Sequence, residues 1–233
     1  MSPPDIRLEA VRASYRGVAV FDGLSCTLPA AMTTAVIGPG GSGKSTLLTI
    51  LGRSIHGAPP GLRVEGFVAL TVGSSSLLPQ RLGALEPARL AETLREAGGE
   101  LGDCVERCWG SFEPGIAARL RGFMEEPPTE LDAETRRLAE LTIAVARGQQ
   151  LLLLDEPLNA LGEGAQQAVR RLLLRIRGTR TIVIVTHNLE FTRAVADEVV
   201  FLLDGELVEQ GSAAKMFENP ARERTRSMIR WGA

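Results

Sequence analysis

A glycine-rich segment of the chain could hold the phosphate groups of a nucleotide. Its sequence fits the pattern G-x-x-x-x-G-K-[ST] at every fixed position. Glycines let backbone N–H groups surround phosphate oxygens, which side chains would obstruct, and a helix that follows adds the positive end of its dipole. We expect Lys44 to reach the β- and γ-phosphates and the Ser45 hydroxyl to ligate Mg²⁺. The alternative is a glycine-rich turn that only joins a strand to a helix. The residues expected to bind the nucleotide, with Mg·ATP as the expected ligand, are Gly38, Pro39, Gly40, Gly41, Ser42, Gly43, Lys44, Ser45 and Thr46.

Polar side chains end two apolar runs farther along the chain. Asp155 and Glu156 follow four leucines in LLLLDEP, and His187 closes TIVIVTH. A carboxylate at the end of a strand beside a phosphate loop suits Mg²⁺, so Asp155 is the candidate metal ligand. Glu156 could orient or deprotonate an attacking water, and His187 could sense that water or the γ-phosphate. A solvated acidic turn and a structural histidine are the alternatives. The candidate catalytic residues are therefore Lys44, Glu156 and His187.

The elements that must position these groups can be predicted from the apolar pattern. Residues 5–37 alternate in short apolar and polar stretches, which indicates strands, and the helical pattern of KSTLLTILGRSI follows the phosphate loop. Residues from about 74 to 147 carry leucines at helical spacing and predict a mostly helical lobe. Strands and helices then alternate from residue 151 onward. We expect one domain, 1–233, with an α/β core formed by 1–73 and 148–233.

The C-terminal part of the chain gives the most specific of these predictions. The expected order is a strand in 151–157, a helix at about 163–177, a strand at 181–187 and a helix at about 189–196. A hairpin turn is expected at Asp204-Gly205. Because the strands are apolar throughout, they predict a mainly parallel sheet covered on both faces.

Composition limits the classes of partner. The formal net charge is −2, which gives the whole chain no attraction to nucleic acid or to an anionic membrane. The three cysteines, Cys26, Cys104 and Cys108, lack metal-ligand spacing and are interpreted as reduced packing residues. No apolar run reaches about 18 residues, so we expect a cytoplasmic protein that meets a membrane only through partners.

Taken together, these motifs resemble the nucleotide-binding subunit of ABC transporters over nearly the whole chain. The resemblance implies a P-loop NTPase core, an N-terminal antiparallel β subdomain and an inserted helical lobe. It also implies that Tyr15, the only tyrosine, stacks on adenine, although a lone tyrosine is otherwise better explained as a core or surface residue. The segments THN (186–188), PGLRVEGFVAL and DGELVEQGSAAKMFENPARERT look most like the phosphate-import subgroup.

The sequence departs from that family at the groups that act between two subunits. Gly73 stands where the family has a glutamine that touches Mg²⁺ and couples to the membrane subunit, and Gln80 is out of register. Gly162 stands where an aspartate is expected at the subunit seam. The family signature Leu-Ser-Gly-Gly-Gln, which grips the γ-phosphate of the opposite subunit, is degenerate here. It falls on Leu131, Asp132, Ala133, Glu134 and Thr135.

These departures suggest a defective surface for the partner's ATP, since two carboxylates would repel a phosphate at contact distance. The leading hypothesis is an ATPase subunit, peripheral on the inner face of the membrane, that couples Mg·ATP to transport, with import of phosphate or another anion favoured. Its expected partners are permease subunits and a second nucleotide-binding subunit with an orthodox signature, so a heterodimer is favoured over a homodimer. The alternatives are an ATP-binding regulatory or assembly module, a soluble ABC-type ATPase acting on DNA or translation, and a P-loop kinase. No nucleic acid is expected as a partner.

Overall fold

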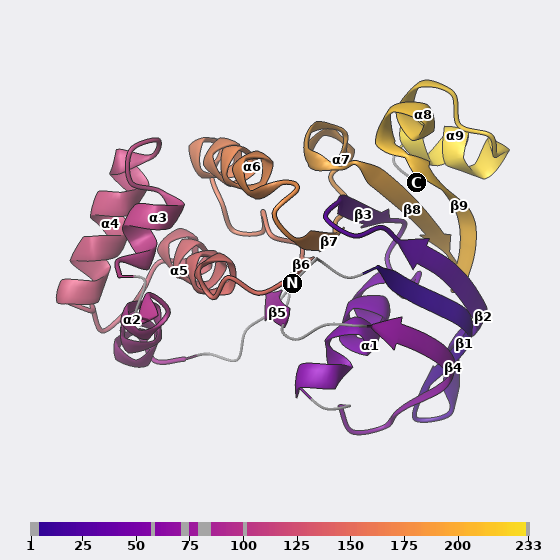
Figure 1. The fold of residues 1–233 in the computed structure, drawn as a ribbon, viewed down its shortest axis with the longest axis horizontal. Coiled ribbons are helices and arrows are strands. Elements are labelled where there is room, and N and C mark those ends of the chain that lie inside the picture. The colour runs from indigo at the N-terminus through magenta and orange to yellow at the C-terminus, as the bar shows by residue number, and fades with distance from the viewer. Residues whose placement is uncertain (1–4, 57–58, 71–74, 79–84, 100–101, 232–233) are drawn as a thin grey trace.

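The fold is built around one six-stranded sheet. The structure is a computed structural model that describes residues 5–56, 59–70, 75–78, 85–99 and 102–231 (Figure 1). Five strands of the sheet are parallel, and the sixth pairs antiparallel at one edge. The predicted α/β fold with a mainly parallel sheet is therefore confirmed. The strands in sheet order are β5 (Ser75–Leu78), β6 (Leu151–Asp155), β7 (Thr181–Val185), β3 (Thr33–Ile37), β8 (Glu198–Leu203) and β9 (Glu206–Ser212).

A second, antiparallel sheet is formed mainly by the N-terminal part of the chain. It contains β2 (Val18–Leu28), β1 (Ile6–Tyr15) and β4 (Leu62–Leu70), in that order. Buried and exposed residues alternate along much of β1 and β2, because one face of this sheet packs on the core and the other meets solvent. This sheet confirms the expected N-terminal antiparallel β subdomain.

The central strands bury both of their faces. Leu151 and Leu153 of β6 pack in a cluster with α1 (Lys44–His56) and the antiparallel sheet. Leu152 and Leu154 of the same strand pack in a cluster with the helices of the opposite side. This double burial explains why the strand reads as a continuous apolar run rather than as an alternation.

A lobe of helices follows β5 and lies at one end of the molecule (Figure 1). Its core surrounds the fully buried Trp109, whose Nε1 donates a 2.7 Å hydrogen bond to Thr142 Oγ1. The three cysteines are free and buried, which agrees with packing roles. The helices of the lobe are α2 (Pro87–Glu96), α3 (Cys104–Cys108), α4 (Pro114–Glu125) and α5 (Ala133–Ala146).

The start of the helical region differs from the prediction of about residue 74. Ser75–Leu78 forms a strand that pairs in parallel with Leu151–Leu154, and the next helix among the described residues begins at Pro87. The reason is that this short segment buries Leu78 and Ser76 at the edge of the core sheet. The division of the chain into core and lobe remains a prediction, with its helical part at Pro87–Ala146.

The C-terminal elements follow the predicted order closely. They are α6 (Glu163–Ile176), β7, α7 (Leu189–Val195), the β8–β9 hairpin, α8 (Ala213–Glu218) and α9 (Glu223–Trp231). Asp204 and Gly205 have φ values of 50° and 80°, as a two-residue hairpin turn of this type requires. Across the described ranges, no helix combines the length and the apolar character needed to cross a bilayer.

Candidate nucleotide-binding site

The phosphate loop joins the buried strand β3 to the N-terminus of α1. Two of its glycines are required by close neighbours: a Cβ on Gly38 would lie 2.1 Å from the Leu202 carbonyl oxygen, and one on Gly43 would lie 2.5 Å from the Phe21 ring. Gly43 also has a φ of 96°, in the left-handed region that favours glycine. Gly40 and Gly41, in contrast, have no heavy atom within 4 Å of an added Cβ. The loop is therefore fixed at its base and open at its tip, where an anion would lie.

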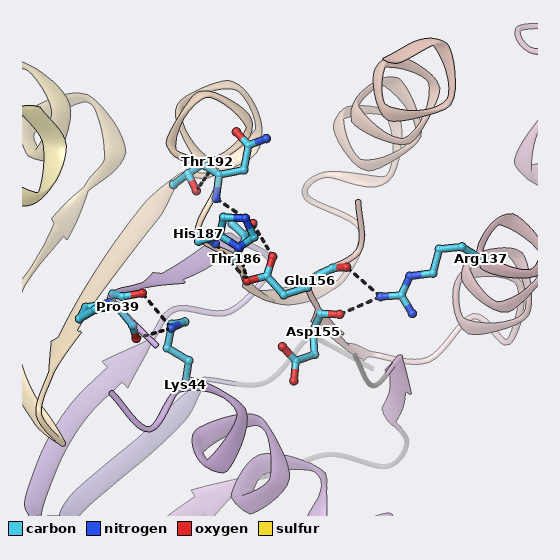
Figure 2. Close-up of polar contacts among 10 residues, drawn as sticks. Pro39, Lys44, Arg137, Asp155, Glu156, Thr186, His187 and Thr192 are labelled. Carbon is cyan, nitrogen blue, oxygen red and sulfur yellow. Dashed lines mark hydrogen bonds and ion pairs between the residues drawn. The ribbon is translucent and has the colours of Figure 1, made fainter. Parts of the chain in front are cut away.

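Lys44 folds back over this loop. Its Nζ donates 2.8 Å hydrogen bonds to the carbonyl oxygens of Gly38 and Pro39 (Figure 2). Burial lowers the pKa of Lys44, and the negative charges of Glu156 and Asp155 oppose that shift. The ammonium group thus lies in the electrostatic field of both carboxylates and could exchange its two carbonyl partners for phosphate oxygens.

Asp155 ends strand β6 and lies near the start of α1. Its carboxylate is buried, and this burial raises its pKa, while a hydrogen bond with the Ser45 side chain and the charges of Arg137 and Lys44 oppose the rise. Within the described ranges, its Oδ1 atom has no hydrogen-bond partner. A buried, unpartnered carboxylate oxygen beside a hydroxyl fits Mg²⁺, which binds through few protein ligands and completes its shell with water and phosphate oxygens. No group of three or more His, Cys, Asp or Glu residues that could form an all-protein metal cage occurs in the described part of the chain.

Glu156 is held by the end of the neighbouring strand β7. Its Oε1 lies 2.8 Å from His187 Nδ1 and accepts a 3.1 Å hydrogen bond from the His187 backbone N–H, and its Oε2 accepts one of 3.1 Å from Thr186 Oγ1. The His187 side chain is 72% exposed, whereas the Glu156 side chain is 11% exposed. The exposed histidine thus lies against the buried carboxylate, beside Thr186 (Figure 2).

The strand order explains how residues far apart in sequence form one site. Strand β7 lies between β6 and β3, and all three run in parallel. Lys44, Asp155 and His187 each lie at or after the carboxyl end of one of these strands. The three residues therefore lie on the side of the sheet where the carboxyl ends of the parallel strands meet. The structure therefore gathers the predicted Lys44, Ser45, Asp155, Glu156 and His187, although their chemical roles remain predictions.

Tyr15 lies at the end of β1, before a turn in which Arg16 and Gly17 have φ values of 47° and 86°. It is half-buried and packs against the apolar cluster that contains the phosphate-loop helix. Phe21 of the next strand contacts the phosphate loop at Gly43. The antiparallel sheet thus borders the loop, while stacking of Tyr15 on adenine remains a prediction.

The residues at the signature position make contacts within the subunit. Asp132 caps the N-terminus of α5 by accepting a 2.8 Å hydrogen bond from the Thr135 N–H. Glu134 accepts a 2.7 Å hydrogen bond from the Gly162 N–H and pairs with Arg119 of α4. These hydrogen bonds lower the pKa of both carboxyl groups, which favours their charged forms. Both sequence departures, at Glu134 and at Gly162, therefore meet in one contact.

The other residues predicted to act at this surface differ in burial or lie outside the described part of the chain. Leu131 is half-buried against the helical lobe, Ala133 is exposed and Thr135 is buried. Gly73 and Gln80 lie outside the described residues.

Two residues of the site were not predicted. Thr186 lies in the motif THN, which does not by itself indicate a role, and its hydroxyl donates a hydrogen bond to Glu156 Oε2. Arg137 is buried and donates to the backbone carbonyls of Asp155 and Glu156 from the side opposite Lys44 (Figure 2). A signal for Arg137 existed in the sequence: it stands at the start of a helix with a largely apolar continuation, LAELTIAVA, where a buried cation requires acceptors.

Comparison with curated proteins finds ATP-binding proteins of importers. The chain is 29% identical to the Fe(3+) ions import ATP-binding protein FbpC 1 of Rhodococcus jostii (strain RHA1), in an alignment that covers 92% of this chain and 64% of that protein. It is 26% identical to the probable amino-acid import ATP-binding protein YxeO of Bacillus subtilis (strain 168), with 97% of this chain and 96% of the relative covered. No protein-family model matches the chain.

Solved structures share the fold. A bacterial Atm1-family ABC exporter with ATP bound matches all of this chain and 43% of its own length, with a TM-score of 0.76 and 20% identity. An ATP-binding subunit of an ABC transporter matches 98% of this chain and 95% of its own, with a TM-score of 0.70 and 19% identity. The chain is thus similar in sequence to import ATP-binding proteins, and it shares its fold with ATP-binding parts of ABC transporters.

Proposed function

We propose that the chain is the ATP-binding and ATP-hydrolysing subunit of an ABC-type import complex. The observation that carries this proposal is the gathering of Lys44, Ser45, Asp155, Glu156 and His187 at one edge of the sheet. Its expected place is the inner face of the membrane, in contact with transmembrane permease subunits. The relatives support import, because both are named as import ATP-binding proteins.

Each residue of the site has a separate role in the proposed hydrolysis of ATP. The loop N–H groups and the Lys44 ammonium bind the phosphate oxygens, and Ser45 and Asp155 would hold Mg²⁺. When bound, Mg²⁺ would neutralise charge on the phosphate oxygens. An Oε atom of Glu156 accepts the proton of the attacking water, and His187 fixes the orientation of that carboxylate. Hydrolysis then depends on Glu156 being charged and correctly aimed.

We propose further that the signature surface of this chain does not serve a partner's ATP. Support comes from Asp132 and Glu134, which occupy the N-terminus of α5 and the Gly162 N–H with their own carboxylates. A phosphate approaching this helix end would meet two negative charges instead of free N–H donors. The chain would therefore work best opposite a nucleotide-binding subunit with an orthodox signature, as a heterodimer with one competent site.

Restoring the signature tests this account. The restored-signature variant carries Asp132→Ser, Ala133→Gly, Glu134→Gly and Thr135→Gln. With Mg·ATP and Glu156→Gln added to stop hydrolysis, we expect this variant to dimerise in light scattering, while the chain with the natural signature and Glu156→Gln stays monomeric. Without Glu156→Gln, the variant should release phosphate far faster than the natural chain, because groups supplied in trans are worth about 10³–10⁵ in rate for P-loop enzymes. Equal and rapid release by the natural chain alone would refute the pairing proposal.

A regulatory or assembly module is the second candidate, and the internally capped signature favours it. It predicts normal ATP binding without phosphate release, even with the restored signature or with a competent partner subunit.

The transported molecule is a separate prediction. The phosphate assignment rests on THN (186–188) and the C-terminal segment, whereas the relatives are named for Fe(3+) and amino acids.

A further inference from the structure

Arg137 connects the helical lobe to the backbone that carries both catalytic-site carboxylates. It lies on α5, is 4% exposed, and its Nη2 donates hydrogen bonds of 2.8 Å to the Asp155 carbonyl oxygen and 2.9 Å to the Glu156 carbonyl oxygen. Its Nη1 lies 3.4 Å from Oε2 of the buried Glu140 on the same helix. One guanidinium group thus holds two consecutive carbonyl groups at the end of β6 (Figure 2).

The backbone that Arg137 holds needs support. Glu156 has a φ of 46°, in the left-handed region, which is unfavourable for a residue with a side chain and persists only where the surroundings impose it. The Glu156 N–H donates a 2.8 Å hydrogen bond to the Val185 carbonyl oxygen on β7. The peptide is therefore held from β7 on its N–H side and from Arg137 on its carbonyl side. Any relaxation of φ would turn the carboxylate away from Thr186 and His187.

The chemistry of the contact suits the planar guanidinium group of arginine. Nη2 donates to both carbonyl oxygens while Nη1 of the same rigid planar group faces Glu140, so one guanidinium meets the β6 backbone and a buried carboxylate together. The positive charge also lies beside a concentration of negative charge, formed by Asp155, Glu156 and Glu140. Arg137 therefore acts on this corner of the site both through directed hydrogen bonds and through charge.

We propose that Arg137 is a positioning residue, which keeps the Asp155–Glu156 backbone in the conformation that aims Asp155 at the metal position and Glu156 at the attacking water. The proposal deepens the ATPase function and rests on it for the role of the two carboxylates. It does not require contact between Arg137 and the nucleotide. Because Arg137 belongs to α5, it also makes the position of the helical lobe a determinant of Glu156 geometry.

The test separates positioning from simple stabilisation. Arg137→Met alone leaves Glu140 buried without its ion-pair partner and can unfold the chain. The double variant Arg137→Met/Glu140→Met removes both buried charges and is expected to fold, since buried pairs replaced by apolar residues are often neutral for stability. Arg136→Met is the matched control, because Arg136 is the neighbouring residue on α5, contacts the Leu85 carbonyl oxygen and does not reach the site. Thermal unfolding verifies that the variants fold.

The first measurement needs no nucleotide. Amide hydrogen exchange of the Glu156 N–H, followed by NMR, should be about tenfold faster in the double variant, because the peptide loses its carbonyl-side support. The Ile182 amide, which bonds to the Met32 carbonyl oxygen at the start of β7, should be unchanged. Unchanged exchange at Glu156 in a folded double variant overturns the proposal, whatever the outcome for ATP binding.

The second measurement addresses the metal position. Calorimetry of ATP with Mg²⁺ and with EDTA gives the tightening of ATP binding that Mg²⁺ provides. In the double variant this tightening should fall by about 10–100-fold, the usual effect of losing a group that orients a metal ligand, while metal-free ATP affinity and the Arg136→Met control stay unchanged. Full tightening by Mg²⁺ in the double variant contradicts the positioning role. Absence of ATP binding in the natural chain contradicts the proposed ATPase function instead, and the exchange result then decides on Arg137 by itself.

Discussion

His187 Nδ1 lies 2.8 Å from Oε1 of Glu156, and the backbone N–H of His187 donates to the same oxygen at 3.1 Å. The residues after β7 thereby fix the Glu156 carboxylate, which follows β6, and Thr186 fixes its second oxygen. Three donors on one carboxylate leave it a single orientation, which is the property a general base for a bound water requires. The proposed roles of the site follow from this arrangement.

Replacing His187 should affect the rate and not nucleotide binding. In the restored-signature variant, we expect His187→Ala to lower the maximal rate of phosphate release by about 10²-fold or more, because Glu156 loses the ring that orients it. Thr186→Val should cost about tenfold, since one of three donors is removed. The ATP dissociation constant, measured by calorimetry, should stay the same for both. A loss of ATP affinity that matches the loss of rate would contradict this division of roles.

Asp155→Asn should stabilise the nucleotide-free chain. Burial raises the pKa of Asp155 above its value in the unfolded chain, so at a pH between these two pKa values the folded chain binds one more proton than the unfolded chain. The stabilisation that this proton provides is therefore complete below the unfolded pKa and is lost as the pH rises through the folded pKa. At neutral pH the buried charge destabilises the fold, and we expect the substitution to raise Tm by roughly 2–4 °C, the shift that about 1 kcal/mol produces in a chain of this size.

The control for this experiment is Asp22→Asn, because Asp22 is exposed and forms an ion pair with the exposed Arg12. Calorimetric unfolding at pH 7 should show no change of Tm for the control. The gain from Asp155→Asn should shrink as the pH is lowered toward the unfolded pKa of the carboxyl group. A lower Tm for Asp155→Asn at pH 7 would show that the carboxylate is stabilised in the fold.

Two glycines of the phosphate loop should respond differently to alanine. Gly43→Ala places a Cβ 2.5 Å from the Phe21 ring at a φ of 96°, so we expect a loss of stability of about 1–3 kcal/mol together with weaker ATP binding. Gly40→Ala meets nothing within 4 Å and should leave the free energy of unfolding within about 0.5 kcal/mol. Urea unfolding measures both effects. Similar destabilisation by the two substitutions would show that the loop has another conformation.

The contact between Glu134 and Gly162 should contribute to stability in a graded way. Glu134→Gln keeps an oxygen that accepts from the Gly162 N–H but loses the charge that faces Arg119, whereas Glu134→Ala loses both. We expect a cost of about 1 kcal/mol for alanine and about half of that for glutamine, because the site is partly exposed. Glu130→Ala, at an exposed position just before α5, serves as the control in urea unfolding. Equal costs for all three would remove the argument that the signature carboxylates are used within the subunit.

The core of the fold was accessible from sequence because its signals are local. The phosphate loop, the LLLLDEP strand and the Asp204-Gly205 turn each identify themselves within about ten residues, and each occurs where expected. The boundary of the helical region was not accessible in the same way. Ser75–Leu78 is a four-residue strand whose identity depends on pairing with Leu151–Leu154, about 75 residues away in the chain.

The same distinction holds for the site. Sequence motifs that indicate phosphate or metal binding contain Lys44, Asp155, Glu156 and His187. The chemical types of these residues and their positions after strands could therefore be predicted. Arg137 acts through two backbone carbonyls that its own neighbours in sequence do not reveal. The intramolecular use of Asp132 as a helix cap could be expected from its position before a helix. The pairing of Glu134 with Gly162 depends on how the lobe packs against the core.

Binding of ATP by the purified chain tests the central claim most directly. Titration calorimetry with Mg·ATP should give one site per chain for the natural sequence. Lys44→Ala should weaken this binding strongly, because the loop loses its only cation among the nine residues 38–46. Absence of heat from ATP in the folded natural chain, or equal affinity in Lys44→Ala, would contradict a nucleotide site at this loop.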